Sequence, residues 1–190
     1  MDLERVTFAC ATATEARVGR RFGGQVAVIG VRARRGLPPG QLVSFGLAGS
    51  LHDGLACGEV LDATKVVDER GEVLWQGGPL GVARARKGTI VAVDRVVDDP
   101  AERRALYART EADAMDMESG PLARSGQLCG CLRAISDTPS RTLGPLADAL
   151  GPDGRLAWSG LARAIARPRE TGRALGDVRR ALRGLQEAAA

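Results

Sequence analysis

The feature that most constrains the fold is an alternation between short, β-branched apolar segments and segments of helical character. Seven apolar segments are bounded by glycine or charged residues, as strands usually are. Several are apolar on both faces, which is typical of strands that helices cover from both sides. The predicted strands span residues 5–11, 25–31, 41–47, 58–68, 88–97, 113–117 and 130–136.

Helical segments separate these strands, and we expect them over residues 14–21, 100–109 and 119–125. Asp99 and Pro100 favour a helix start, because Asp is a good N-cap residue and Pro fits the first helical turn. The alternation indicates an α/β fold with one sheet and helices on both faces. At 190 residues the natural expectation is a single domain, 1–190.

One connection does not fit the simplest parallel arrangement. Parallel neighbours need a crossover of about a dozen residues, usually a helix. Residues 32–41, RARRGLPPGQ, contain two prolines and two glycines, which exclude a full helix. Either a minimal loop joins the second and third strands, or these two strands are not parallel neighbours.

The last part of the chain, residues 143–190, predicts helices that pack on the same domain. Its apolar residues recur at helical spacing, and Pro168 interrupts the pattern, so we expect two helices. The apolar positions are Leu156, Leu161 and Ile165 in the first, and Leu175, Val178, Leu182 and Leu185 in the second.

Composition excludes several classes of function. The net charge is +4, but the arginines are scattered and the chain has only three Phe, two Trp and one Tyr, so a nucleic-acid surface is not indicated. Four cysteines and one histidine lack metal-site spacing, so we expect no metal. The sequence has no apolar run long enough for a membrane span and starts without the basic region of a secretion signal. We therefore expect a cytoplasmic protein.

Candidate functional residues lie where predicted strands end. Glu118 and Asp137 each follow an apolar strand, and Glu15 comes soon after the first one. Because open α/β sheets bind ligands outside the carboxyl ends of their strands, these residues are expected to converge on one crevice. A carboxylate at such a junction can instead complement a helix dipole, and for Glu118 taken singly that is the simpler interpretation.

A glycine-containing turn follows the third predicted strand, within SFGLAGS at residues 44–50. Glycines at a strand end allow backbone N–H groups to point into a cleft, where they can hold anions or ribosyl oxygens. In a glycine-rich chain such a turn is more often only a turn.

Taken in order, these motifs resemble the purine nucleoside phosphorylase and nucleosidase superfamily, which includes methylthioadenosine/S-adenosylhomocysteine nucleosidase. The chain is similar in particular to its hopanoid-associated branch. The matching stretches run over nearly the whole chain and include VSFGLAGSL, VAVDRVVDDPAERRAL, ADAMDMES and ISDTPSRTLGP. The resemblance implies a three-layer α/β/α sandwich around a central mixed, mostly parallel sheet.

The resemblance also implies roles for individual residues. Asp137 matches the acid that protonates the purine, and Glu15 matches the acid that activates water. Glu118 matches the carboxylate that binds ribose hydroxyls, with Met117 beside the sugar. The remaining matches are the turn that faces the nucleophile, at Gly46, Ala48, Gly49 and Ser50, and the purine-facing residues, at Val96, Val97 and Ser136.

These roles suit cleavage of an N-ribosyl bond. The reaction passes through an oxocarbenium-like state, so it needs a protonated leaving base, negative charge near the sugar and a poised nucleophile. Asp137 must then hold a proton near neutral pH, which burial or a nearby carboxylate can achieve by raising its pKa.

The sequence leaves the reaction partners open. Glu15 favours water as the nucleophile, whereas the resemblance to the family favours phosphate as a co-substrate. We expect no other cofactor. One candidate substrate is adenosylhopane, which would bring the basic tail helices to the inner face of a membrane. The alternative is a small nucleoside such as methylthioadenosine or S-adenosylhomocysteine. A non-catalytic protein that binds a nucleoside or lipid is a third hypothesis, and the resemblance implies a homo-oligomer.

Overall fold

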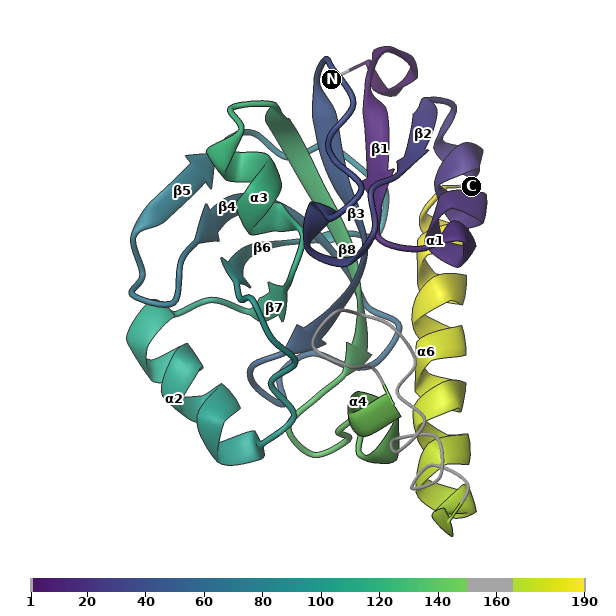
Figure 1. The fold of residues 1–190 in the computed structure, drawn as a ribbon, viewed down its shortest axis with the longest axis vertical. Helices are drawn as coiled ribbons and strands as arrows, with labels where there is room; N and C mark the ends of the chain where they lie inside the picture. The colour runs from purple at the N-terminus through teal and green to yellow at the C-terminus, as the bar shows by residue number, and fades with distance from the viewer. Residues whose placement is uncertain (1, 150–165, 190) are drawn as a thin grey trace.

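One mixed sheet dominates the computed structural model, which describes residues 2–149 and 166–189 (Figure 1). The strand order is β2-β1-β3-β7-β6-β4-β5, and β8 pairs with both β3 and β4. Five of the pairings are parallel and three are antiparallel, which confirms a mixed, mostly parallel sheet. The strands are β1 Thr7–Cys10, β2 Gln25–Val28, β3 Leu42–Ser50, β4 Val60–Val67, β5 Val73–Gln76, β6 Arg86–Ala92, β7 Ala114–Asp116 and β8 Leu128–Asp137.

Helices cover both faces of the sheet, as predicted. Successive side chains of a strand point to opposite faces. On β8, Cys131 belongs to the apolar cluster that contains Leu122 of α3, whereas Leu132 belongs to the cluster that contains Ala181 of α6. The described helices are α1 Ala13–Gly19, α2 Pro100–Thr110, α3 Ser119–Arg124, α4 Pro145–Ala149 and α6 Pro168–Ala188.

Most sequence predictions of elements are confirmed, with differences at their ends. Asp99 caps α2, where its carboxylate accepts the Ala101 N–H at 2.9 Å. The strand predicted at 88–97 ends at Ala92, so Val96 and Val97 lie in the segment that leads to α2. The prediction missed β5, a four-residue strand that pairs with β4.

The short connection between β2 and β3 has a simple explanation. Both strands pair in parallel with β1, so they lie on either side of it and are not neighbours. This was the second of the two alternatives. The connection contains a short 3-10 helix, Val31–Ala33, which brings Val31 to the cavity described below.

The last helix, α6, runs along one face of the sheet (Figure 1). Its buried face carries Ala174, Asp177, Ala181 and Leu185, and Leu175, one of the apolar positions at helical spacing, is exposed. The helix packs closely, since a Cβ on Gly184 would lie 2.1 Å from the Gly58 carbonyl oxygen.

Two further predictions concern the tail. Pro168 is in the first turn of α6 and starts the helix. The helix predicted around Leu156, Leu161 and Ile165 lies outside the described residues. Within the described residues, no helix combines the length and the apolar character that crossing a membrane requires.

Candidate active site

The candidate site is a cavity of about 260 Å³ where several chain segments meet. Strands β3 and β8 run in parallel and end together, with Gly49 opposite Asp137. Strand β7 pairs with β3 on its other side and places Met115 opposite Gly49. The start of α1, the segment before α2 and single residues of α6 and of the β8–α4 connection complete the wall.

The structure brings together most of the residues that the sequence predicted for the site. Those that line the cavity are Glu15, Ala48, Gly49, Val96, Val97, Met117, Glu118, Ser136 and Asp137. Gly46 and Ser50 are not among its lining residues. Gly46 packs behind Glu15, and the buried Ser50 hydroxyl donates to the His52 carbonyl at 2.6 Å.

Asp137 ends β8 and is almost completely buried, with 3% of its surface exposed. One carboxyl oxygen accepts from the Ser136 hydroxyl at 2.5 Å, and the other accepts from Arg103. Burial raises the pKa of Asp137 above its usual value, and Arg103 opposes this rise. Burial therefore gives Asp137 one property that a general acid needs, a greater tendency to hold a proton.

Glu15 lies in the first turn of α1 and has two sets of contacts. One carboxyl oxygen accepts from the backbone N–H and the hydroxyl of Thr12, both at 2.8 Å, which forms a capping box. The other oxygen accepts the Leu47 N–H of β3 at 3.1 Å. The carboxylate is thus held firmly at the cavity by backbone and hydroxyl donors.

Glu118 lies beside two other carboxylates. Burial, Asp116 and Glu15 raise the pKa of Glu118 to about 7, while Arg133 and the Arg32 N–H oppose the rise. The Arg32 N–H donates to one oxygen at 3.2 Å, and Arg133 lies 3.5 Å from the other. Glu118 therefore changes its charge near neutral pH.

Four charged residues of this site, Arg95, Arg103, Arg133 and Asp116, were not predicted from the sequence, and Arg95 lines the cavity. Arg103 of α2 lines the cavity, and Arg133 of β8 lies behind it; neither has any exposed surface. Asp116 lines the cavity and forms an ion pair with Arg133. A signal for Arg133 was available, because an arginine inside an apolar strand must have buried partners. Arg103 gave no such signal, since α2 has no strong apolar face to show which side is buried.

Apart from Arg95 and Thr12, the remaining wall of the cavity is apolar. Besides Val96, Val97 and Met117, it includes Val31, Val93, Met115, Leu143 and Val178. Among the residues that the structure describes, aliphatic and methionine side chains line the cavity and no aromatic ring does. Such a lining with a few convergent charged groups is typical of a small-molecule site.

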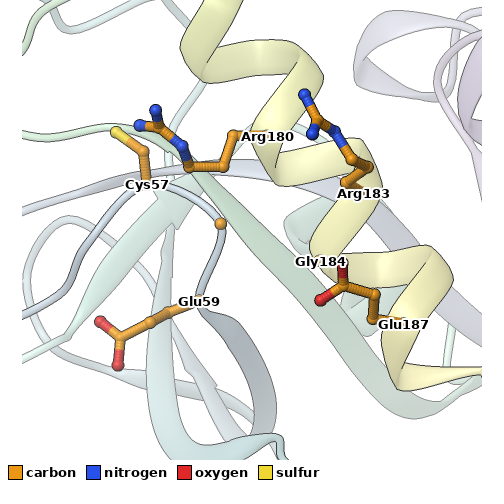
Figure 2. A pocket seen from close by; sticks show the side chains of 7 residues that line it. Cys57, Glu59, Arg180, Arg183, Gly184 and Glu187 are labelled. Carbon is orange, nitrogen blue, oxygen red and sulfur yellow. The ribbon is translucent and has the colours of Figure 1, made fainter.

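A second cavity, of about 340 Å³, lies between α6 and the β3–β4 connection (Figure 2). Two arginines and two glutamates face it, so their charges balance, and Arg180 is already paired with Asp177 at 3.0 Å. None of the predicted site residues lines it. The lining residues are Cys57, Gly58, Glu59, Arg180, Arg183, Gly184 and Glu187.

Solved structures with the same architecture include nucleosidases from Helicobacter pylori. Its 5′-methylthioadenosine/S-adenosylhomocysteine nucleosidase with a bound pyrrolidine ligand aligns with a TM-score of 0.61 at 16% identity, covering 99% of this chain and 98% of that one. A mutant of the same enzyme, with 5′-methylthioadenosine in its active site, gives 0.55 at 16% identity and 97% coverage of both chains. The chain has the nucleosidase fold.

Futalosine hydrolase of the same organism, in a mutant form, aligns with a TM-score of 0.54 at 16% identity, over 69% of this chain and 89% of that chain. No family model matches the sequence, and no curated protein matches it. At these identities the similarity shows the fold, and the chemistry has to be argued from the cavity.

Proposed function

We propose that the protein cleaves the N-ribosyl bond of an adenine nucleoside and releases adenine. The observation that carries this proposal is the meeting of Asp137, Glu118 and Glu15 at one cavity, much of whose remaining wall is apolar. The three carboxylates come from distant parts of the sequence, and each has the surroundings that one part of the reaction needs. The nucleosidase fold supports the same conclusion.

In the proposed reaction Asp137 is the general acid. The bond between C1′ and the base nitrogen breaks, its electron pair goes to the base, and the Asp137 carboxyl proton neutralises the departing adenine. Burial raises the pKa of Asp137, so the proton is available closer to neutral pH than on an exposed carboxyl. Gly49 lies against the carboxyl, and a Cβ there would be 2.8 Å from one of its oxygens.

The negative charge near Glu118 stabilises the sugar as positive charge develops on it. Glu118, Asp116 and Glu15 surround a single arginine, Arg133, so carboxylates outnumber the cation. Negative charge that is already in place needs no reorganisation when the oxocarbenium forms. In this proposal Glu118 accepts hydrogen bonds from the ribose hydroxyls, and Met117 contacts the ring.

Water is the nucleophile we favour. Glu15 lines the cavity at the start of α1, and in this proposal its carboxylate takes a proton from water as the water oxygen attacks C1′. The negative charge of this carboxylate would repel phosphate. The products are then adenine and the free ribosyl compound, and no cofactor is needed.

The apolar wall favours an adenosyl compound with an apolar 5′ substituent, and adenosylhopane is our first candidate. Val31, Leu143 and Val178 supply aliphatic surface from three separate segments, which suits a hydrocarbon group. The second candidate is 5′-methylthioadenosine or S-adenosylhomocysteine, because the former occupies the active site of one nucleosidase with this fold.

The test is adenine release, followed by chromatography, from adenosylhopane and from methylthioadenosine, each with and without phosphate. We expect release without phosphate, and a loss of about 10²–10⁴-fold in rate for Asp137→Asn. Asp53→Asn is the matched control, because Asp53 is an exposed residue outside the cavity. Nucleoside binding without release by the wild-type protein would show a non-catalytic binding protein, and strict dependence on phosphate would replace hydrolysis by phosphorolysis.

A further inference from the structure

Arg103 contacts three separate parts of the candidate site. Its Nε donates to the Val97 carbonyl at 2.9 Å, and one terminal nitrogen donates to the Ser50 carbonyl at 3.2 Å. The other terminal nitrogen donates to Asp137. One fully buried guanidinium thus joins the end of β3, the segment before α2 and the proposed acid. The fork of N–H groups on arginine suits such simultaneous contacts.

Asp98 connects Arg103 to the segment between β8 and α4. It lies 3.5 Å from the same terminal nitrogen of Arg103 that contacts Asp137. Its two carboxyl oxygens accept the N–H groups of Leu143 and Gly144, both at 2.8 Å. Because Leu143 lines the cavity, Asp98 links this part of the cavity wall to Arg103, which contacts Asp137.

We infer that Arg103 is a positioning residue for Asp137. Arg103 holds the Asp137 carboxyl group beside Gly49 and limits the pH range over which that group can donate a proton. The negative charge of Asp98 partly offsets the effect of the positive charge of Arg103. The inference rests on the proposed function in so far as Asp137 is the acid. Arg103 acts through Asp137, since every nitrogen of its guanidinium already contacts a protein acceptor.

The two charges have opposite effects on Asp137. The positive charge of Arg103 stabilises the ionised carboxylate and lowers the pKa of Asp137, whereas the negative charge of Asp98 raises it. Other ionisable groups lie in this part of the molecule. They are Cys57 in the β3–β4 connection, Asp177 on α6, Glu15, Glu118, Asp116 and Arg95 at the cavity, and Arg133 behind it.

The experiment compares Arg103→Gln with Asp98→Asn. The titration of the Asp137 carboxyl is followed by carbon NMR, with the signal assigned by its absence in Asp137→Asn. We expect Arg103→Gln to raise the pH of titration by about one to three units, and Asp98→Asn to lower it by less. The limb of the kcat/KM profile that falls with rising pH should move in the same two directions.

Opposite shifts separate this role from simple damage to the fold, which would lower activity in both variants without moving the limb in opposite directions. Arg103→Lys keeps the positive charge, so its titration should stay closer to that of the wild type. Arg104→Gln is the matched control, because Arg104 is the next residue on α2 and is exposed. If Arg103→Gln does not fold, Arg103→Met replaces it as the variant without the positive charge, and Asp98→Asn still gives the direction of the Asp98 effect.

An unchanged Asp137 titration in folded Arg103→Gln, or a shift of the same sign in Asp98→Asn, would overturn the inference. Its failure differs from failure of the proposed function. A wild-type protein that releases no adenine refutes the function, while the NMR titration still decides what Arg103 does to Asp137. Normal release together with an unmoved titration refutes only the role of Arg103.

Discussion

Two buried arginines, Arg103 and Arg133, differ in what surrounds them. Two of the contacts of Arg103 are with backbone carbonyls, and its charged partners are Asp137 and Asp98. Arg133 donates to one carbonyl and to the Ser44 hydroxyl at 2.5 Å. Its ion-pair partners are Asp116 and Glu118, and Glu15 is near enough to add to the negative charge around it.

This difference indicates that the two arginines have different roles at one cavity. Around Arg133 the carboxylates are in excess, which suits stabilisation of a cationic sugar. Burial is the largest cause of the raised pKa of Glu118, and the neighbouring carboxylates add to it. Around Arg103 the backbone contacts join chain segments, and the charges of Arg103 and Asp98 shift the pKa of Asp137. Gly46 is near the first group and Gly49 lies against the second, three strand residues apart, or about 10 Å.

Replacing each arginine by methionine gives the largest expected effect. Arg133→Met leaves three carboxylates without their cation in a buried site, and should lower the free energy of unfolding by about 3–5 kcal/mol. Arg103→Met should cost less, because Asp98 is partly exposed and Asp137 can take up a proton. Urea unfolding at pH 7 measures both, and an equal or greater loss for Arg103→Met would contradict the comparison.

The two glycines of β3 give the next largest effect. Gly46 has φ +151°, and a Cβ there would lie 2.3 Å from a Glu15 oxygen. Gly46→Ala should therefore cost about 1–3 kcal/mol of stability and displace Glu15. At Gly49 the nearest atom to a new Cβ is an Asp137 oxygen at 2.8 Å, and the backbone needs no glycine. Gly49→Ala should cost less stability but reduce adenine release.

Thermal unfolding and initial rates distinguish these two outcomes. Gly126→Ala is a useful control, since Gly126 has φ +75° but no atom within 4 Å of a new Cβ. It isolates the cost of the backbone conformation from that of the contact with a carboxylate. A Gly46→Ala protein as stable as Gly126→Ala, and with Glu15 undisturbed, would show that the Gly46 contact is unimportant.

The sequence predicted the carboxylates of the site better than their cations. Glu118 and Asp137 are recognisable because each follows an apolar strand, and the apolar character of a strand is a local signal in the sequence. Arg103 is different, because its burial depends on packing between α2 and residues about 50 and 34 positions away along the chain. In a chain rich in exposed arginines, local composition does not single it out.

The fold shows the same limit. Helix α2 was predicted almost to its ends because Asp99 and Pro100 are local signals. Strand β5 was missed because four residues at a sheet edge carry little periodicity, and its pairing with β4 is a tertiary property. Leu175 fits the helical spacing of its neighbours, yet the face of α6 that meets the sheet carries mostly small residues.

The smallest effect we predict tests the excess of carboxylates around Arg133. The pKa of Glu118 is about 7 in the folded protein against a usual value of 4.5, so between these pH values the folded state holds a proton that the unfolded state has lost. The contribution of Glu118 to stability is therefore present below pH 4.5 and declines as the pH rises through 7. Glu118→Gln removes this decline, since glutamine has no charge to bury.

We expect the free energy of unfolding of Glu118→Gln to match that of the wild type at pH 5 and to exceed it by about 1–2 kcal/mol at pH 8. Arg133 keeps Asp116 as an ion-pair partner in this variant, so its own charge stays compensated. Glu187→Gln on the exposed side of α6 is the control and should show no such dependence on pH. The opposite result would be a Glu118→Gln protein whose stability relative to the wild type falls between pH 5 and pH 8. It would mean that Arg133 needs the carboxylates of both Asp116 and Glu118. The two arginines would then differ in their backbone contacts but not in their balance of charge.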